Sequence, residues 1–378
     1  MKKIFFSVLA IAAIAACTKS EVQYESPAEI GFAPAVKNVT KAAMSGDLST
    51  ANPDQNLGIW AFWNKTEAPT STSASTLTPT FASYDDNYLV NALFVRKTVT
   101  VGDNSVTAWG GTTAYPWPTN GSLVFAGYTT PGADVLSNSA VSYVLNTDTM
   151  TFTNYTQSNG FDLCWFGRTE ESYNNRISGD AIPVVLSHAL SWLKFNVKGE
   201  GSSIGWKITQ ITLNDISSTG TGTCIGSGAG AASWSCATDS YTTDLTLFNN
   251  TNSPIVLSSS VYDIETTAAA TQSTPATVNN DIIVIPQTIN AGGQSASRTQ
   301  HTLTITYQFP VGDSNGSTNW KTDTKTVNLD IDASDQTKNK WVSGTKYTYT
   351  LTFKANEILV SPSYGDWTPG TTPGITVE

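Results

Sequence analysis

Short apolar segments that alternate with polar residues and end at turn residues place the tightest limit on the fold of this chain. In residues 57–65, LGIWAFWNK, apolar side chains fall on both alternating faces, as in a central strand of a sandwich. Leu193, Phe195 and Val197 alternate in the same way. Glycine, asparagine, proline and serine separate such segments, whereas helix signals are scarce. The pattern predicts an all-β protein of sandwich type, not one of alternating helices and strands.

Length and composition indicate two domains of extracellular character. The 378 residues include 11 tryptophans and 14 tyrosines, too many aromatic side chains for a disordered chain. A polar, turn-rich stretch at 168–181 precedes a renewed strand pattern, so we expect domains at 42–181 and 182–378. The formal net charge of −10 disfavours nucleic acid as a partner and offers no basic surface for acidic lipid.

The start of the chain carries an export pattern. Lys2 and Lys3 precede an apolar run at 4–16, which as a helix would cover only about 20 Å of a bilayer core of about 30 Å. We therefore expect a signal peptide over residues 1–16. The run IAAC, which ends at Cys17, resembles the bacterial lipobox. This implies a palmitate-type acylation of Cys17 and a lipoprotein anchored in the cell outer membrane and exposed at the surface. The alternative is an ordinary signal peptide with a chance cysteine.

Cysteines and histidines are few and scattered along the chain. Cys224 and Cys236 flank a stretch rich in glycine and serine, and in an oxidising compartment they could form a disulfide or stay unpaired. We expect Cys164 to be a small core residue, His188 to be a hydrogen-bonded structural histidine, and His301 to be exposed at the start of a strand. The sequence has no CxxC motif, no clustered Cys/His set, no catalytic serine motif and no phosphate-binding loop. We therefore expect no metal, no cofactor and no enzyme activity.

Four stretches of the sequence, taken in order, resemble the fimbrillin family, the subunits of type V pili in Bacteroidetes. They are EIGFAPAVKNVTKAA (29–43), NLGIWAFW with AYPWPTNGSLVFAGYTT (56–63 and 114–130), LSHALSWLKFNV (186–197), and IVIPQTI followed by WVSGTKYTYTLTFKANEILVSPSYGDW (283–289 and 341–367). The resemblance implies two tandem transthyretin-like β-sandwich domains. It also implies a structural role in a fimbrium that supports cell adhesion, with other pilin subunits as partners in a homo- or heteropolymer.

The family resemblance further implies that a trypsin-like protease, specific for arginine or lysine, removes the N-terminal strand. A C-terminal strand of the next subunit would then fill the gap by strand addition. The corresponding propeptide here is 17–41, with Lys41 as the expected cleavage residue and Lys37 as the second choice. No arginine precedes Arg96, so an arginine-only protease could not make this cut, and strand and lipid would stay in place. Lys41 as an ordinary solvated loop residue is the alternative.

The C-terminal segment 357–378 resembles a donor strand in two parts, because apolar residues alternate on both sides of a turn. The apolar positions are Ile358, Val360, Trp367, Ile375 and Val377. The same segment would equally suit the last strand of the chain's own sheet.

Two other functions are open on the sequence alone. A non-polymerising surface lipoprotein that binds host glycans or proteins would use aromatic platforms, and an exposed pair such as Trp109 and Trp117 would favour it. A hydrolase would need two carboxylates about 5–10 Å apart in a cleft.

Overall fold

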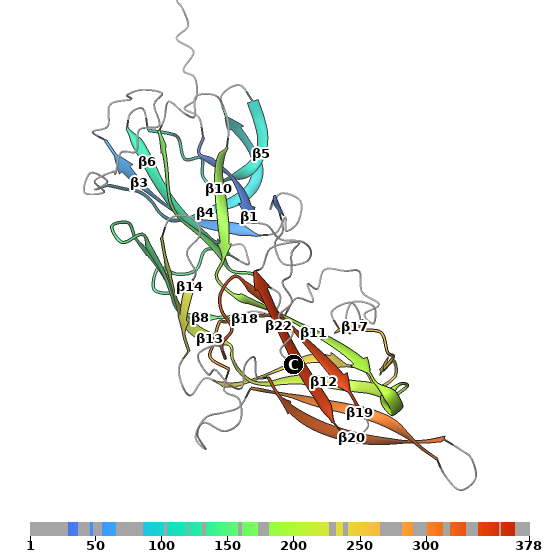
Figure 1. Ribbon diagram of the computed structural model, residues 1–378. Helices are drawn as coiled ribbons and strands as arrows, with labels where there is room; N and C mark the ends of the chain where they lie inside the picture. The colour runs from blue at the N-terminus through green and yellow to red at the C-terminus, as the bar shows by residue number, and fades with distance from the viewer. Residues whose placement is uncertain are drawn as a thin grey trace, which may run out of the picture.

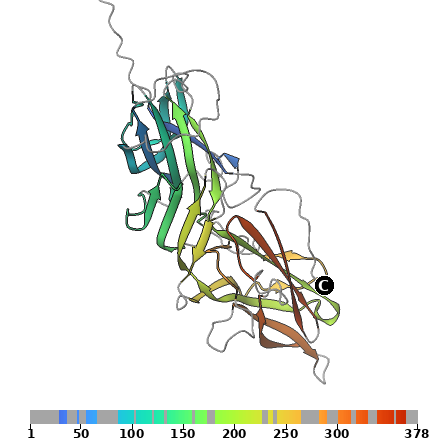
Figure 2. The same ribbon diagram turned by 60° about the vertical axis from the view of Figure 1, so that its left-hand side comes forward.

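The structure is all-β, as the alternating sequence pattern predicts. The computed structural model describes residues 29–36, 46–47, 55–65, 86–101, 104–118, 121–130, 134–157, 161–172, 181–226, 232–236, 241–264, 282–289, 301–312, 318–329, 339–354 and 357–366. Figures 1 and 2 show an elongated molecule, with strands from the first half of the chain at one end and strands from the second half at the other. No helix in this part of the chain has the length and apolar character that crossing a bilayer requires.

The first sheet closes on itself. Its strands follow the order β10-β9-β6-β3-β4-β5-β1-β2, and a further pairing joins β1 to β10. The strands are β1 (Gly31–Val36), β2 (Gly46–Asp47), β3 (Asn56–Asn64), β4 (Asp86–Val101), β5 (Asn104–Gly111), β6 (Ser122–Thr130), β9 (Cys164–Ser172) and β10 (Ile182–His188). Strands β10 to β1 therefore form a ring, in which β1 is the element that joins the two ends.

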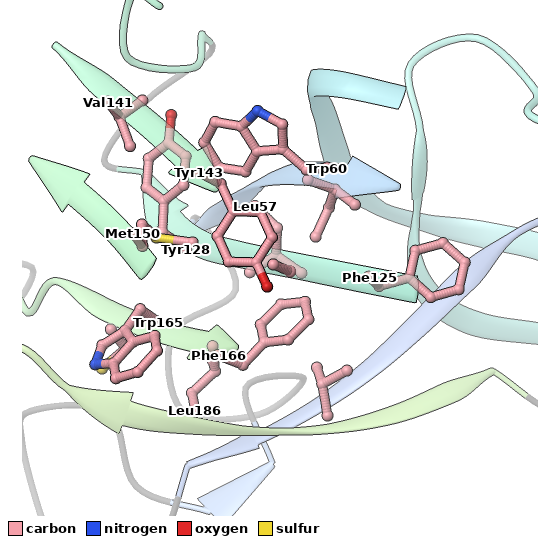
Figure 3. Close-up of a cluster of buried hydrophobic side chains, with 14 of the residues drawn as sticks. Leu57, Trp60, Phe125, Tyr128, Val141, Tyr143, Met150, Trp165, Phe166 and Leu186 are labelled. Atoms are coloured by element: carbon pink, nitrogen blue, oxygen red, sulfur yellow. The ribbon is translucent and has the colours of Figure 1, made fainter. Parts of the chain in front are cut away.

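An aromatic core explains why the strands of this sheet are apolar on both faces. Every residue of β6 is buried, and its two faces meet different partners. Phe125 points to one side, where its ring lies 5.2 Å from that of Phe32. Tyr128 points to the other side, where it packs 5.7 Å from Trp60 and 5.6 Å from Phe152. Figure 3 shows Trp60, Phe125 and Tyr128 in this cluster.

A second sheet covers the outer side of that core and mixes strands from both halves of the chain. Its order is β14-β13-β8-β7, and its strands are β7 (Val141–Val144), β8 (Thr149–Thr156), β13 (Thr219–Ile225) and β14 (Ala232–Ser235). Gly222 on β13 is required by close packing, because a Cβ there would meet the ring of Trp234 at 2.7 Å. The hairpin β13–β14 thus lies flat enough for Trp234 to stack on Phe152 at 6.4 Å.

The second half of the chain forms two further sheets around a core of its own. One sheet has the order β17-β11-β21-β22 with β18 paired to β11, and the other has the order β15-β12-β19-β20 with β16 paired to β12. Their strands are β11 (Ser191–Gly199), β17 (Tyr262–Asp263), β18 (Ile282–Val284), β21 (Thr345–Phe353) and β22 (Ile358–Asp366), then β12 (Lys207–Ser217), β15 (Tyr241–Asn249), β16 (Ile255–Val256), β19 (Thr302–Gly312) and β20 (Thr318–Asn328). A 3-10 helix, Gly201–Ser203, links β11 to β12. Phe195 and Tyr349 stack at 5.3 Å in this core.

The structure moves the boundary between the two halves beyond the expected position before Ile182. Strand β10 belongs to the first sheet, where it pairs with β1 and β9. Trp192 packs in the first core and its neighbour Leu193 in the second, so the change occurs inside β11. Part of the polar stretch that suggested the boundary, Arg168 to Ser172, belongs to strand β9, with which β10 pairs.

His301, which the sequence analysis places on the surface, is buried at 1% exposure. Its Nε2 lies 3.1 Å from Oε1 of Gln287, and the same oxygen accepts a hydrogen bond of 2.8 Å from the Ser217 backbone N–H. The Trp341 ring meets the imidazole edge-on at 5.6 Å. Burial lowers the pKa of His301 to about 4, since the charged imidazolium is poorly solvated there.

Burial of His301 should make folding sensitive to mild acid. The unfolded chain takes up the proton near pH 6.5 and the folded chain only near pH 4. Stability should therefore be unaffected above about pH 6.5 and fall as the pH drops towards 4, by a total on the order of 3 kcal/mol. Urea unfolding followed by tryptophan fluorescence between pH 4 and 7 should show a smaller loss for His301→Gln than for the wild type. A constant difference between the two proteins across this range would contradict the assignment.

Candidate functional site

The candidate functional site is the position of β1 in the closed sheet, between β5 and β10. On one side β1 runs parallel to β10 over five residue pairs, from Phe32↔Ile182 to Val36↔Leu186. On the other side it pairs with β5 only at Gly31 and Phe32, and with β2 at its far end. We call this position the first-strand slot. Figure 1 shows β1 beside β10 and β5 at the N-terminal end of the molecule.

The side chains of β1 and the residue before it alternate between core and surface. Ile30 and Phe32 are fully buried, whereas Ala33 is exposed. The Phe32 ring packs edge-on against Phe94 and Phe125, each at 5.2 Å. Phe166 approaches the same ring at 6.2 Å. Such edge-to-face contacts add to the burial energy of the ring, so Phe32 is the main side-chain anchor of β1.

Polar contacts hold the start of β1. The Ile30 backbone N–H donates to the Tyr115 carbonyl at 2.8 Å. Lys97 Nζ lies 2.6 Å from Glu29 Oε1 and also donates to the Gly111 carbonyl at 2.6 Å. Both partners of this ion pair are partly buried, with exposures of 30% and 17%, so water screens it less than a pair on the open surface. Strand β1 is therefore held in the slot by an ion pair at its start and by the aromatic contacts of Phe32 inside.

Strand β10 depends on β1 for most of its backbone pairing. It pairs with β9 only at Ser187 and His188, whereas β1 supplies partners for Ile182 to Leu186. Without β1, the backbone N–H and C=O groups on this stretch of β10 and on the end of β5 would lack partners. The slot is thus a place where a strand is required and where another strand of suitable side chains could bind.

Most of the residues proposed from the sequence as processing or donor sites lie outside the described residues. These are Cys17, Lys37, Lys41, Trp367, Ile375 and Val377. Lys37 follows Val36, the last residue of β1, directly in the sequence.

Ile358 and Val360 belong to β22 and are used by the chain's own sheet. Strand β22 pairs with β21 over nine residue pairs, from Phe353↔Ile358 to Thr345↔Asp366. Both side chains are partly buried against the second core. In this form of the chain, residues 358–366 are the last strand of their own sheet, and donation by Ile358 and Val360 stays a prediction.

The disulfide considered for Cys224 and Cys236 is not formed, because both cysteines are free. The hairpin register explains this. Cys224 is paired with Ala232, while Cys236 follows Ser235, the partner of Thr221. The two cysteines therefore lie at different positions along the hairpin, too far apart for a bridge.

The aromatic pair that would have favoured glycan binding is buried. Trp109 is 1% exposed and Trp117 is 3% exposed. Trp109 Nε1 donates to the Gln55 carbonyl at 2.8 Å, and Trp117 packs edge-on against Phe125 at 5.9 Å. These rings are core residues and offer no platform to a sugar.

A buried polar cluster that sequence reasoning missed lies where β9 and β10 meet. His188 Nδ1 is 2.7 Å from Asp162 Oδ2 and 3.5 Å from Cys164 Sγ. His188 is the hydrogen-bonded structural histidine that we expected, and Cys164 is a core residue. The cluster cannot work as a cysteine–histidine–aspartate relay, since both partners face the same ring nitrogen and a relay needs one partner on each. The signal in the sequence was weak because 24 positions separate Cys164 from His188.

Comparison with known proteins identifies the family to which this all-β chain belongs. The profile of the fimbrillin-like family matches residues 40–367. The chain belongs to the fimbrillin-like family. Membership supports a structural role as a pilus subunit or adhesin at the cell surface. Among curated proteins, none matches this chain.

Several solved structures of related description align with most of the chain. A putative cell adhesion protein from Bacteroides uniformis has 14% identity and a TM-score of 0.44, over 90% of this chain and 99% of its own. A fimbrial assembly protein from Parabacteroides distasonis has 9% identity and a TM-score of 0.36, over 89% and 95%. The tip fimbrial protein Mfa3 from Porphyromonas gingivalis has 10% identity and a TM-score of 0.31, over 83% and 94%. All three scores are low, so the family assignment rests on the profile match alone.

The aromatic contacts of Phe32 predict that β1 contributes strongly to stability. Phe32→Ala removes a fully buried ring from between three others and should lower the free energy of unfolding by about 3–5 kcal/mol. Ala33→Ser is the matched control on the opposite, exposed face, and should change stability by no more than about 0.5 kcal/mol. Urea denaturation measures both. Equal, small effects of the two substitutions would mean that β1 is not an integral part of the core.

Proposed function

We propose that this chain is a polymerising structural subunit of a type V pilus, exported as a lipoprotein and assembled by protease-triggered strand exchange. The observation that supports this most directly is the position of β1. It is first in the sequence among the described strands, yet it lies in the interior of the sheet and joins its two ends. Such a strand can be removed by one cut without changing the order of the other strands, and its removal leaves a gap that another strand fits.

The energetics of β1 favour exchange over simple loss. Ile30 and Phe32 are fully buried. At about 1.5–3 kcal/mol for each buried side chain, they contribute roughly 3–6 kcal/mol before the backbone pairs are counted. A cut alone therefore does not release β1, because these contacts persist across the nick. An incoming strand with equally apolar side chains and a full set of backbone partners is needed to displace it.

The donated segment in this proposal is 367–378 of a neighbouring subunit, and Ile358 and Val360 remain in their own sheet. The six residues of β1 cover about 20 Å as a strand. The twelve residues after Asp366 could reach about 40 Å when extended, which is enough to cross between subunits and occupy the slot. Trp367, Ile375 and Val377 are the apolar residues that would replace Ile30 and Phe32.

Processing and anchoring are coupled in this scheme by the order of residues along the chain. Cys17, the proposed lipidation site, precedes β1, and Lys37 and Lys41 follow it. A cut at either lysine therefore breaks the covalent link between the remainder of the subunit and the segment that carries both the lipid and β1. When a donor strand then displaces β1, the subunit is freed from the outer membrane in the same step. An uncut subunit would stay anchored and closed.

Cleavage after Lys37 or Lys41 should start assembly. Precursor carrying Cys17→Ser, which cannot be lipidated, is incubated with trypsin, and the products are identified by intact mass. We expect one main cut in this region, followed by oligomers on size-exclusion chromatography and filaments in the electron microscope. The double variant Lys37→Gln/Lys41→Gln is the matched control and should stay uncut and monomeric. If the Cys17→Ser precursor with both lysines intact is cut but stays monomeric, polymerisation is refuted.

Removal of the donor segment should separate folding from assembly. A chain that ends at Asp366 retains every strand that the structure describes, so its thermal stability should stay within a few degrees of the full chain. After trypsin treatment it should form no oligomers, because no neighbouring subunit has a donor segment to place in the first-strand slot. Persistent oligomers after this deletion would show that another segment is donated.

A peptide control tests whether the slot is the receiving site. A peptide with the sequence of residues 29–36, added in excess before the cut, should suppress assembly of the full chain by keeping the slot filled. The same peptide with Phe32→Ala should suppress it much less, since it lacks the ring that occupies the Phe94, Phe125 and Phe166 pocket.

A further inference from the structure

Three side chains with metal-binding atoms converge at the junction of β9 and β10. Cys164 is the first residue of β9 and the direct cross-strand partner of His188, and Asp162 lies two positions before it. The His188 Nδ1, the Cys164 Sγ and a carboxylate oxygen of Asp162 all lie within 4.8 Å of one another. Within the described part of the chain this is the one such group of three. Because Cys164 and His188 are paired across two strands and Asp162 shortly precedes Cys164, the backbone holds the three side chains in one place.

All three residues are deeply buried, which makes their charge state important. Asp162 is 1% exposed, Cys164 is fully buried and His188 is 7% exposed. The second oxygen of Asp162, Oδ1, is buried and accepts no hydrogen bond from the described residues. A buried carboxylate with an unused oxygen is costly unless a cation compensates it.

We propose that Asp162, Cys164 and His188 bind a divalent transition-metal ion, with Zn²⁺ as the best match. Thiolate, imidazole and carboxylate are the usual ligands of zinc in proteins. One thiolate, one carboxylate and one neutral imidazole around a dication give a site of zero net charge, which is the favourable arrangement in an apolar interior. On binding, the thiol proton leaves to solvent and the imidazole proton resides on Nε2, so that Nδ1 can coordinate.

Two of the three distances between the ligand atoms fit this ion, one directly and one after a small adjustment. The third, between Asp162 and Cys164, is no more than 4.8 Å. Bonds of about 2.0–2.3 Å in tetrahedral geometry put neighbouring ligand atoms about 3.3–3.6 Å apart. The separation of Cys164 Sγ and His188 Nδ1, 3.5 Å, already meets this. The separation of His188 Nδ1 and Asp162 Oδ2, 2.7 Å, must open by roughly half an ångström, which a small rotation of the carboxylate achieves.

Neighbouring groups hold the ligands in position. Thr129 Oγ1 accepts a hydrogen bond of 2.8 Å from the Cys164 backbone N–H and donates to the Asp162 carbonyl at 3.2 Å. This one hydroxyl thus fixes the spacing of Asp162 and Cys164. Contacts of this kind around metal ligands commonly set affinity.

A metal here would have a structural consequence for the first sheet. The ligands join β9 and β10 where these strands share only two residue pairs. The ion would therefore cross-link β10 to β9. If the proposed removal of β1 occurs, this cross-link would keep β10 in place as the edge that receives a donor strand. Metal binding itself does not depend on that function and is tested on uncut protein.

The test measures metal binding by the full-length Cys17→Ser chain. The protein is unfolded, freed of metal with a chelator, refolded with or without equimolar Zn²⁺, dialysed and assayed by elemental analysis and thermal melting. We expect one zinc per chain and a higher melting temperature with zinc. Refolding with Co²⁺ instead should produce the absorption of a cobalt–thiolate bond.

Matched variants locate the ion. Cys164→Ser and Asp162→Asn should each weaken zinc binding by at least about 100-fold. Cys224→Ser, which changes another fully buried free cysteine, should bind as the wild type does. The proposal is overturned if the wild type retains no zinc and shows no cobalt–thiolate band. Equal retention by Cys164→Ser, or loss of binding in Cys224→Ser, would overturn it as well.

Discussion

The parallel pairing of β1 with β10 is the interaction on which the first half of the molecule depends. It supplies backbone partners for five residues of β10, which otherwise contacts β9 through only two pairs. It also places Phe32 among Phe94, Phe125 and Phe166, so that one short strand closes both the hydrogen-bond ring and the aromatic core. A closed sheet has no free edges, and it stays closed only while this strand is present.

The two halves of the chain share their structure more than the sequence suggests. The β13–β14 hairpin comes from the second half, yet it completes the sheet over the first core. Trp234 on this hairpin donates from Nε1 to the Ala189 carbonyl at 2.6 Å, and Ser343 Oγ donates to the Ala232 carbonyl at 2.9 Å. Ile283 and Ile285 also belong to the first core, so it is complete only after residues up to 285 are in place. Its contacts are therefore long-range, and its folding should be slow relative to a local domain.

The candidate site was predictable in part. A strand near residues 30–32 can be recognised from the apolar residues Ile30 and Phe32, because period-two apolar patterns need only local sequence. The partner of that strand was not predictable, since pairing with β10 brings together residues 150 positions apart, as in Phe32↔Ile182. The burial of His301, Trp109 and Trp117 was not predictable for the same reason, because the residues that cover them come from distant strands. The register of one hairpin, equally invisible in the sequence, kept Cys224 and Cys236 apart.

The sequence by itself determined the all-β class, the positions of many strands and the membership of the fimbrillin-like family, because strand alternation, turn residues and family patterns are local properties. Only the tertiary structure decided which strands are neighbours: that β1 closes the first sheet, that β22 completes its own, and that Asp162, Cys164 and His188 share one buried place. Strand pairing is chosen by the burial of whole faces against distant residues, and no short stretch of sequence contains that information.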